Sequence, residues 1–235
     1  MGKLLSTNTR FYFNGVDPGL HGSRFTVTLE GAVLDPTAIV DNAERVHPGE
    51  RMDSFDYAGF FDDDTGSSTL GLEAISGTSV GDGSQQLMVL VGTGTGSVAY
   101  AGTGYWLAHK PVANIRDLVR VEGTWAMDKQ WSRGKHTGVK RTATAGTNSG
   151  TIDDGAATTA GGTFYVQVFE VTAGTLTFNL EHSTDGTTWA NKLAPTFTGR
   201  GDLATAFTGS LHRYVRTSSG ITAGTSSYAG AYVRD

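Results

Sequence analysis

The sequence contains no cysteine, which excludes disulfide bonds, thiolate metal ligands and a cysteine nucleophile. Proline is also scarce, with 5 among 235 residues, and charged residues make up only 17% of the chain. The longest apolar run, residues 87–91, is far too short to cross a membrane as a helix, and the first residues do not predict a signal peptide. The net charge of −5 argues against a globally basic nucleic-acid-binding protein.

Small and polar residues are abundant instead. Glycine occurs 33 times and threonine is frequent, whereas hydrophobic residues make up 38% of the chain. A glycine-rich chain without much proline or a strict repeat is typical of loop-rich β proteins or of partly disordered ones. The alternating patterns described next favour the first class. A chain of this length forms one large domain or two small ones around a buried core.

The first 141 residues are predicted to contain several strands. A strong turn signal, Asn14-Gly15, follows the apolar triplet 11–13. Residues 24–30 alternate between apolar and polar side chains, as in a half-buried strand. Further strands are predicted at 86–91, 98–107 and 117–125, and a polar, mobile arm at 1–10. Asp35-Pro36-Thr37 fits either the start of a short helix or an extended loop, and residues 69–75 fit a short helical segment.

The remaining residues begin with a predicted break in regular structure. Residues 142–162 consist almost entirely of Thr, Ala, Gly, Ser and Asn, which predicts a long loop or a linker. A turn at Gly174 is expected between two of the later strands, and Ser183-Thr184-Asp185-Gly186 is expected to form a hairpin turn. Those strands are predicted at 163–171, 175–182, 211–217 and 227–233. Short antiparallel strands at this spacing predict a mainly β protein, a β-sandwich or barrel with one or two short helices and long Gly/Thr-rich loops.

Patterns that imitate catalytic or metal sites are incomplete. Ser79 lies in the spelling Gly-x-Ser-x-Gly of a nucleophile elbow, but no helix is predicted after it. Asp62, Asp64 and Glu73 have the spacing of calcium-loop ligands, but the glycine that such a loop needs at its sixth position is missing. Arg200-Gly201-Asp202 matches an adhesion tripeptide, which a turn explains. The six histidines are scattered. We therefore expect a protein that is not an enzyme and has no cofactor or metal.

Charge is distributed unevenly along the chain. Acidic residues dominate between residues 30 and 82, and basic residues dominate between residues 116 and 141. Such asymmetry can steer association between unlike surfaces of identical copies, although two solvated faces explain it equally well. The candidate acidic contacts are Asp53, Asp56, Asp62, Asp63 and Asp64. The candidate basic inter-subunit contacts are Arg116, Arg120, Lys129, Arg133 and Lys135.

The aromatic residues suggest two alternatives. Trp125 and Trp131 lie within the basic stretch, and basic residues interleaved with aromatics can bind single-stranded nucleic acid. An exposed row of aromatic side chains would instead favour a β-sandwich binding module, such as a capsid decoration protein or a carbohydrate-binding or adhesion protein. The candidates for that row are Tyr100, Tyr105, Trp106, Trp125 and Trp131. Core packing is the more common use of such side chains.

Two groups of segments resemble proteins of bacteriophage tails. The first group resembles the N-terminal half of the major tail (tail tube) proteins of long-tailed phages. It comprises Phe11-Tyr12-Phe13-Asn14-Gly15-Val16-Asp17, residues 24–30, Val33-Leu34-Asp35-Pro36-Thr37 and Gly59-Phe60-Phe61-Asp62-Asp63. The second group is similar to the C-terminal half of tail proteins common in phages of actinobacteria. It comprises residues 177–189, with Glu181-His182-Ser183-Thr184-Asp185-Gly186 at their centre, and Arg213-Tyr214-Val215-Arg216.

The resemblance implies a structural virion protein, made in the cytoplasm of the bacterial host, that builds the phage tail tube. Members of the family form rings, usually hexameric, which stack into a hollow tube through which DNA is ejected. Their β-sandwich core carries a flanking helix, strands of neighbouring subunits join into an inner barrel, and long loops and arms reach the next ring. A duplicated tube domain, which would give trimeric rings, is the lesser option.

The partners implied by the resemblance are copies of the chain itself, the tape-measure protein and other tail proteins, and no membrane. DNA would pass without specific binding through a lumen that is typically acidic, so the acidic block would line the lumen or form a contact between rings. On this interpretation, 1–10 is an N-terminal arm, 11–141 is the N-terminal part of the tail-tube domain, 142–162 is a loop or linker, and 163–235 is the C-terminal antiparallel part. The family has no catalytic residues to transfer.

Overall fold

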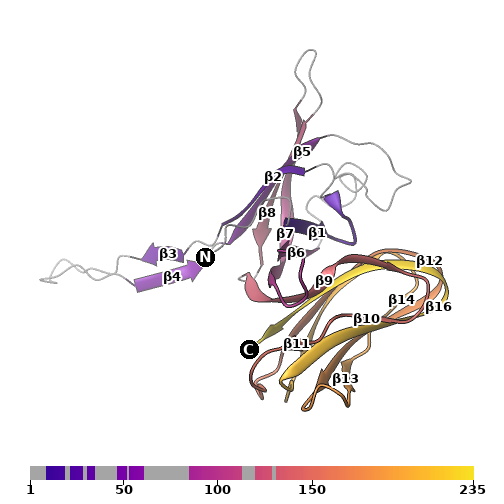
Figure 1. Ribbon diagram of the computed structural model, residues 1–235. Coiled ribbons are helices and arrows are strands. Elements are labelled where there is room, and N and C mark those ends of the chain that lie inside the picture. Colours follow the sequence, from indigo (N-terminus) through magenta and orange to yellow (C-terminus); the bar gives the residue numbers. More distant parts are fainter. Residues whose placement is uncertain are drawn as a thin grey trace, which may run out of the picture.

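The computed structural model describes residues 9–18, 22–28, 31–34, 47–51, 53–60, 85–112, 120–128 and 131–235 (Figure 1). Most of the predicted arm, both predicted helical segments, Ser79 and the calcium-like pattern from Asp62 to Glu73 lie outside these ranges.

Antiparallel β-strands dominate the described residues, which confirms the mainly β prediction. They form one 14-stranded sheet and a separate two-stranded sheet. The strands before residue 130 are β1 (Thr9–Phe13), β2 (Gly22–Thr28), β3 (Gly31–Leu34), β4 (His47–Arg51), β5 (Ser54–Phe60), β6 (Gln85–Val91), β7 (Val98–Val112) and β8 (Arg120–Met127). The later strands are β9 (Ser132–Ala143), β10 (Thr147–Asn148), β11 (Ile152–Asp153), β12 (Gly162–Ser183), β13 (Ala190–Leu193), β14 (Thr196–Phe197), β15 (Gly201–Phe207) and β16 (Tyr214–Arg234).

Strand β9 joins an N-terminal half to a C-terminal half. The main path of the large sheet runs β13-β12-β16-β9-β7-β8-β5-β2, and β6 and β1 continue from β7 on a branch. β9 pairs with β7 on one side and with β16 on the other, so a single sheet passes through both halves. Figure 1 shows β12 and β16 curving through the C-terminal half as two long neighbouring strands. The predicted loop at 142–162 contains the end of β9 and the short strands β10 and β11, which both pair with β16.

The predicted turn at Asn14-Gly15 is confirmed. Asn14 and Gly15 have φ angles of 47° and 69°, as the two central residues of a type I′ turn require. The turn is closed by two backbone hydrogen bonds, in which Phe13 N donates to Val16 O (3.1 Å) and Val16 N donates to Phe13 O (2.7 Å). Asparagine and glycine are the residues that adopt this left-handed backbone most easily, which is why so short a motif predicts the turn.

The hydrophobic side chains form three clusters. The cluster of the N-terminal half is aromatic, with the rings of Trp106 and Trp125 stacked 5.2 Å apart. A second, largely aliphatic cluster lies within the C-terminal half. The third lies between the halves, where Tyr12 packs edge-on against Phe169 with ring centroids 4.8 Å apart. Burial of this third cluster favours one fixed arrangement of the two halves.

The prediction of a turn at Gly174 is wrong. The predicted strands 163–171 and 175–182 belong to the single strand β12, which pairs with β16 along its length with three register shifts. Gly174 has a φ of 74° and lies in a Thr-Ala-Gly-Thr tetrapeptide, residues 172–175, and the same tetrapeptide recurs at 222–225 on β16. A glycine with positive φ fits a bulge as well as a reversing turn, and here the long neighbouring strand keeps the chain extended.

Candidate assembly surfaces

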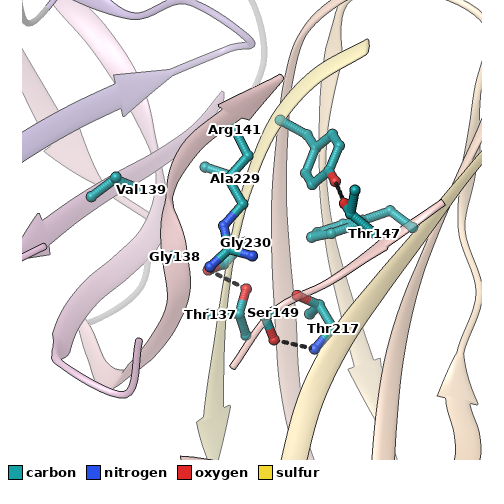
Figure 2. A pocket seen from close by; sticks show the side chains of 11 residues that line it. Thr137, Gly138, Val139, Arg141, Thr147, Ser149, Thr217, Ala229 and Gly230 are labelled. Carbon is teal, nitrogen blue, oxygen red and sulfur yellow. Dashed lines mark hydrogen bonds between the residues drawn. The ribbon is translucent and has the colours of Figure 1, made fainter. Parts of the chain in front are cut away.

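A small cavity lies beside the pairing of β9 with β16 (Figure 2). Its volume is about 10 Å³, which is room for one water molecule at most. Polar groups around it bond to one another: Tyr228 and Thr147 share a hydrogen bond of 2.7 Å, and Thr217 N donates to Ser149 Oγ (2.8 Å). This cavity is a packing gap beside a hydroxyl cluster and is too small to bind a substrate.

A larger, basic pocket lies between β7, β9, β16 and the residues after β11. Its volume is about 240 Å³. Asp154 lies at its inner side with a side chain only 5% exposed, and its carboxylate accepts hydrogen bonds from Lys135 Nζ (2.6 Å) and Tyr232 Oη (2.8 Å). Arg234 Nε lies 3.0 Å from the same carboxylate. Burial, together with the nearby Asp154 carboxylate, holds the pKa of Tyr232 well above its ordinary value, so its hydroxyl stays protonated.

Arg133 lines the same pocket and is exposed. Within the described part of the chain, its guanidinium has no hydrogen-bond or ion-pair partner. The pocket therefore contains the side chains of Arg133, Lys135 and Arg234, with Asp154 as the single carboxylate among its lining residues. The predicted basic contacts Arg133 and Lys135 are thus brought together. Arg234, Asp154 and Tyr232 were missed, because they lie in segments with no local run of basic residues.

An acidic groove of about 240 Å³ lies on the solvent-facing side of β2, β5 and β8. Asp56 lines it, and its Oδ1 accepts a hydrogen bond from Thr124 Oγ1 (2.9 Å). Glu122 also lines the groove, and it is exposed and makes no ion pair with any described residue. Lys110 lies opposite Glu122 in the register of β7 and β8. Tyr105, 43% exposed, pairs with Ala126 and so lies on the same face of the sheet.

The other predicted charged contacts are found in different places. Asp53 is buried, and its carboxylate accepts a hydrogen bond from the backbone N–H of Trp131 (2.8 Å), so it stabilises the chain internally. Arg120 is the first residue of β8. The remaining predicted contacts, Asp62, Asp63, Asp64, Arg116 and Lys129, lie outside the described residues.

The prediction of an exposed row of aromatic side chains is wrong for its three tryptophans. Trp106 and Trp125 are 0% exposed and Trp131 is 5% exposed, all within the core of the N-terminal half. They pack against the phenylalanines of β1 and β5, as large apolar rings do where a core is available. The interleaving of Trp125 and Trp131 with basic residues therefore does not give stacking platforms for nucleic acid.

The adhesion tripeptide is not presented to solvent as a turn. Gly201 and Asp202 begin β15. The Asp202 carboxylate accepts the backbone N–H of Gln86 (3.1 Å), and burial raises its pKa. Gln86 Oε1 accepts the N–H of Leu203 (3.0 Å), and Gln167 donates to Gln86 O (3.2 Å). This buried network fastens β6 of the N-terminal half to β12 and β15 of the C-terminal half.

Residues 184–189, which belong to the C-terminal segments that resemble tail proteins, form the loop between β12 and β13, and this confirms the predicted hairpin turn. The Asp185 carboxylate accepts the backbone N–H groups of Thr187 and Thr188, both at 2.8 Å, and these bonds hold its pKa well below the ordinary value. The guanidinium of Arg216 lies over the Trp189 ring at 4.1 Å and also pairs with Glu181.

Comparisons with known proteins give a structural likeness at low sequence identity. No protein-family model and no curated protein matches the sequence. Among solved structures, the chain is similar to the Dit protein (gp 19.1) of phage SPP1, described as a hub of the adsorption apparatus in phages that infect Gram-positive bacteria. The identity is 11%, the alignment covers 96% of this chain and 99% of that one, and the TM-score is 0.37. A TM-score this low does not establish a common fold.

Among the described residues there is no helix long and apolar enough to pass through a membrane. Nor do these residues bring together three or more His, Asp or Glu side chains in a way that could hold a metal ion.

Proposed function

We propose that this protein is a non-enzymatic structural subunit of a bacteriophage tail, and that it assembles with copies of itself into stacked rings that form the tail tube. The observation that carries the proposal is that, within the described residues, the large sheet has an open edge in each half, at β2 and at β15. β2 pairs with β5 alone, and β15 pairs with β12 alone. An unpaired edge strand offers backbone donors and acceptors to another chain.

The N–H of Leu203 in β15 donates to Gln86 Oε1 (3.0 Å), but the rest of this edge lacks the usual protection against such pairing. Its seven residues, Gly-Asp-Leu-Ala-Thr-Ala-Phe, contain no proline and no basic side chain. Its single charge, Asp202, bonds internally to Gln86. Monomeric β proteins commonly place lysine, proline or a bulge on such an edge. The absence of all three from β15 favours an edge that pairs with another chain in an assembly.

The two open edges belong to different halves of the chain. A contact between β15 of one copy and β2 of another would be head-to-tail, because the two surfaces are unlike. Repeated head-to-tail contacts generate a ring when the rotation closes and a filament when it does not. A rotation that closes would give the rings that the resemblance to tail tube proteins implies, and a second kind of contact would stack these rings into a tube.

The hairpin formed by β3 and β4 also supports assembly. Figure 1 shows it extending away from the large sheet, and its two strands pair only with each other within the described residues. An isolated two-stranded hairpin is marginally stable in water. Contact with a neighbouring subunit would supply the packing that it lacks.

The proposal is tested by sedimentation velocity over a concentration series. The wild-type protein should form species larger than a monomer as concentration rises, and Ala204→Lys, which places a charge on the exposed side of β15, should shift the distribution toward monomer. Thr198→Lys is the matched control, because Thr198 is also exposed but lies outside any strand. Wild-type protein that stays monomeric at every concentration would refute the proposal.

A further inference from the structure

The basic pocket contains more positive charge than its own residues neutralise. Asp154 is already engaged by Lys135, Tyr232 and Arg234, and it is almost fully buried. Its single negative charge cannot compensate three cations. Arg133 is left with no partner among the described residues and points its charge to a surface that solvent reaches. A guanidinium in such a hollow favours a bidentate carboxylate or phosphate.

The pocket has room for such a group. Gly96 and Gly134 are among its lining residues, so part of its wall is backbone without side chains. A water molecule occupies about 30 Å³ of liquid, so a hollow of about 240 Å³ holds a carboxylate with its methylene groups and a few waters. The site is therefore large enough for the end of an acidic side chain.

The acidic groove of the same chain has the complementary charge but lies too far away. Arg133 is opposite Tyr100 on β7, whereas Glu122 is opposite Lys110 on that strand. Ten residues of extended strand separate the two positions, which corresponds to roughly 30 Å. One copy therefore cannot bring Glu122 to Arg133, but two copies in a head-to-tail contact can.

The geometry points to an interface in which the basic pocket of one copy receives Glu122, beside Asp56, from the acidic groove of a second copy. This inference rests on the proposed self-assembly and assigns one of its contacts. The contact joins unlike surfaces, so in a pair of copies one basic pocket and one acidic groove remain unoccupied. Further copies can bind there, and the assembly therefore does not stop at a dimer. Charge pairs of this kind set register and speed encounter, and they weaken as salt is raised.

Charge reversal tests the contact directly. Arg133→Glu and Glu122→Arg should each weaken association, measured by sedimentation equilibrium, by about tenfold or more. The double variant R133E/E122R restores opposite charges across every contact and should recover most of the lost affinity. Arg200→Glu and Glu170→Arg are matched controls, because both residues are exposed and lie outside the pocket and the groove. These controls should change association by less than about twofold.

Each possible result decides between the proposals. Loss on single reversal with recovery in the double variant supports the contact. Wild-type assembly that R133E leaves unchanged overturns this contact but not self-assembly, and so does a double variant that fails to recover. If titration with inorganic phosphate shows binding that R133E abolishes while association is unaffected, the pocket binds a free anion and the second-copy assignment is wrong. Circular dichroism and thermal unfolding should be the same for R133E and wild type, since the Arg133 side chain makes no hydrogen bond or ion pair with the described residues.

Discussion

Gly15 shows how a single backbone position connects the two halves. Its φ is 69°, and a Cβ added there would lie 2.7 Å from the carbonyl oxygen of Val168 on β12. Its N–H donates to Gln167 Oε1 at 2.6 Å, so the turn of the N-terminal half is bonded to a strand of the C-terminal half. The glycine is needed both for its conformation and for the close approach.

Replacing Gly15 by alanine should therefore cost more than the conformational penalty alone. Gly15→Ala is expected to lower the free energy of unfolding by about 2–4 kcal/mol, measured by urea denaturation. Gly155→Ala is the control, because Gly155 has a similar φ of 78° but nothing lies within 4 Å of an added Cβ. That variant should lose only about 1 kcal/mol. Equal losses in the two variants would show that the contact with β12 is not tight.

Two histidines predict that mild acid destabilises the fold. Burial lowers the pKa of His136, and Arg141 nearby lowers it further. Burial also lowers the pKa of His182, with contributions from the stacked His212 and from Lys192. A folded-state pKa below the unfolded value of about 6.5 gives stability that is present above that pH and is lost as pH falls.

The midpoint temperature of thermal unfolding should accordingly be lower at pH 5.5 than at pH 7.5, at constant ionic strength. His182→Gln should reduce this dependence, because glutamine can accept the N–H that His212 donates to His182 Nδ1 (3.1 Å) but does not titrate. A midpoint that does not change, or that rises toward acid, would contradict the assignment of these histidines as neutral groups.

At the scale of elements, the paired Thr-Ala-Gly-Thr segments shape the long β12–β16 ladder. Thr175 N donates to Thr222 Oγ1 (2.9 Å), and Thr225 N donates to Thr172 Oγ1 (2.8 Å), so each tetrapeptide bonds the other in the same way. The side-chain hydroxyls replace ladder bonds that the bulges interrupt. The ladder is therefore irregular here, but the N–H groups of Thr175 and Thr225 remain hydrogen-bonded.

Alanine at either bulge glycine should disturb this arrangement. A Cβ on Gly174 would lie 2.5 Å from Thr222 Oγ1, and a Cβ on Gly224 would lie 2.5 Å from Thr172 Oγ1. Gly174→Ala and Gly224→Ala should each lower the free energy of unfolding by about 1–3 kcal/mol, measured by chemical denaturation. The double variant should lose less than the sum of the two single losses, because both substitutions distort the same bulge. Gly220→Ala, at a site of β16 with open space, should be close to neutral. Full additivity would indicate two independent bulges.

Local patterns in the sequence predicted local structure well. The strand at 86–91 and the turns at Asn14-Gly15 and Asp185-Gly186 follow from alternation and from residues that tolerate positive φ. The merging of predicted strands into β12 and β16 could not be predicted, because glycine is favoured both in reversing turns and in β-bulges. Part of the basic pocket was predicted, because Arg133 and Lys135 lie in a basic stretch of the sequence. Arg234 was not, because it lies in a strand about a hundred residues later.

At the scale of the whole molecule, we expect the two halves to unfold as one cooperative unit. β9 belongs to both, and the third hydrophobic cluster is formed from both sides. Trp106, Trp125 and Trp131 lie in the N-terminal half, so tryptophan fluorescence reports mainly on that half, whereas far-ultraviolet circular dichroism reports on all strands. The two signals should follow a single coincident urea transition. A fluorescence transition that clearly precedes or follows the other would show that the halves unfold separately.

Open edges, complementary charged surfaces and an extended hairpin all favour a subunit that is completed by its neighbours. The measurement that tests this most directly is negative-stain electron microscopy of the purified, concentrated protein. Rings or hollow tubes with a regular axial repeat are the predicted result, and their rotational symmetry would give the number of subunits in a ring. A uniform field of small single particles at high concentration would contradict the account.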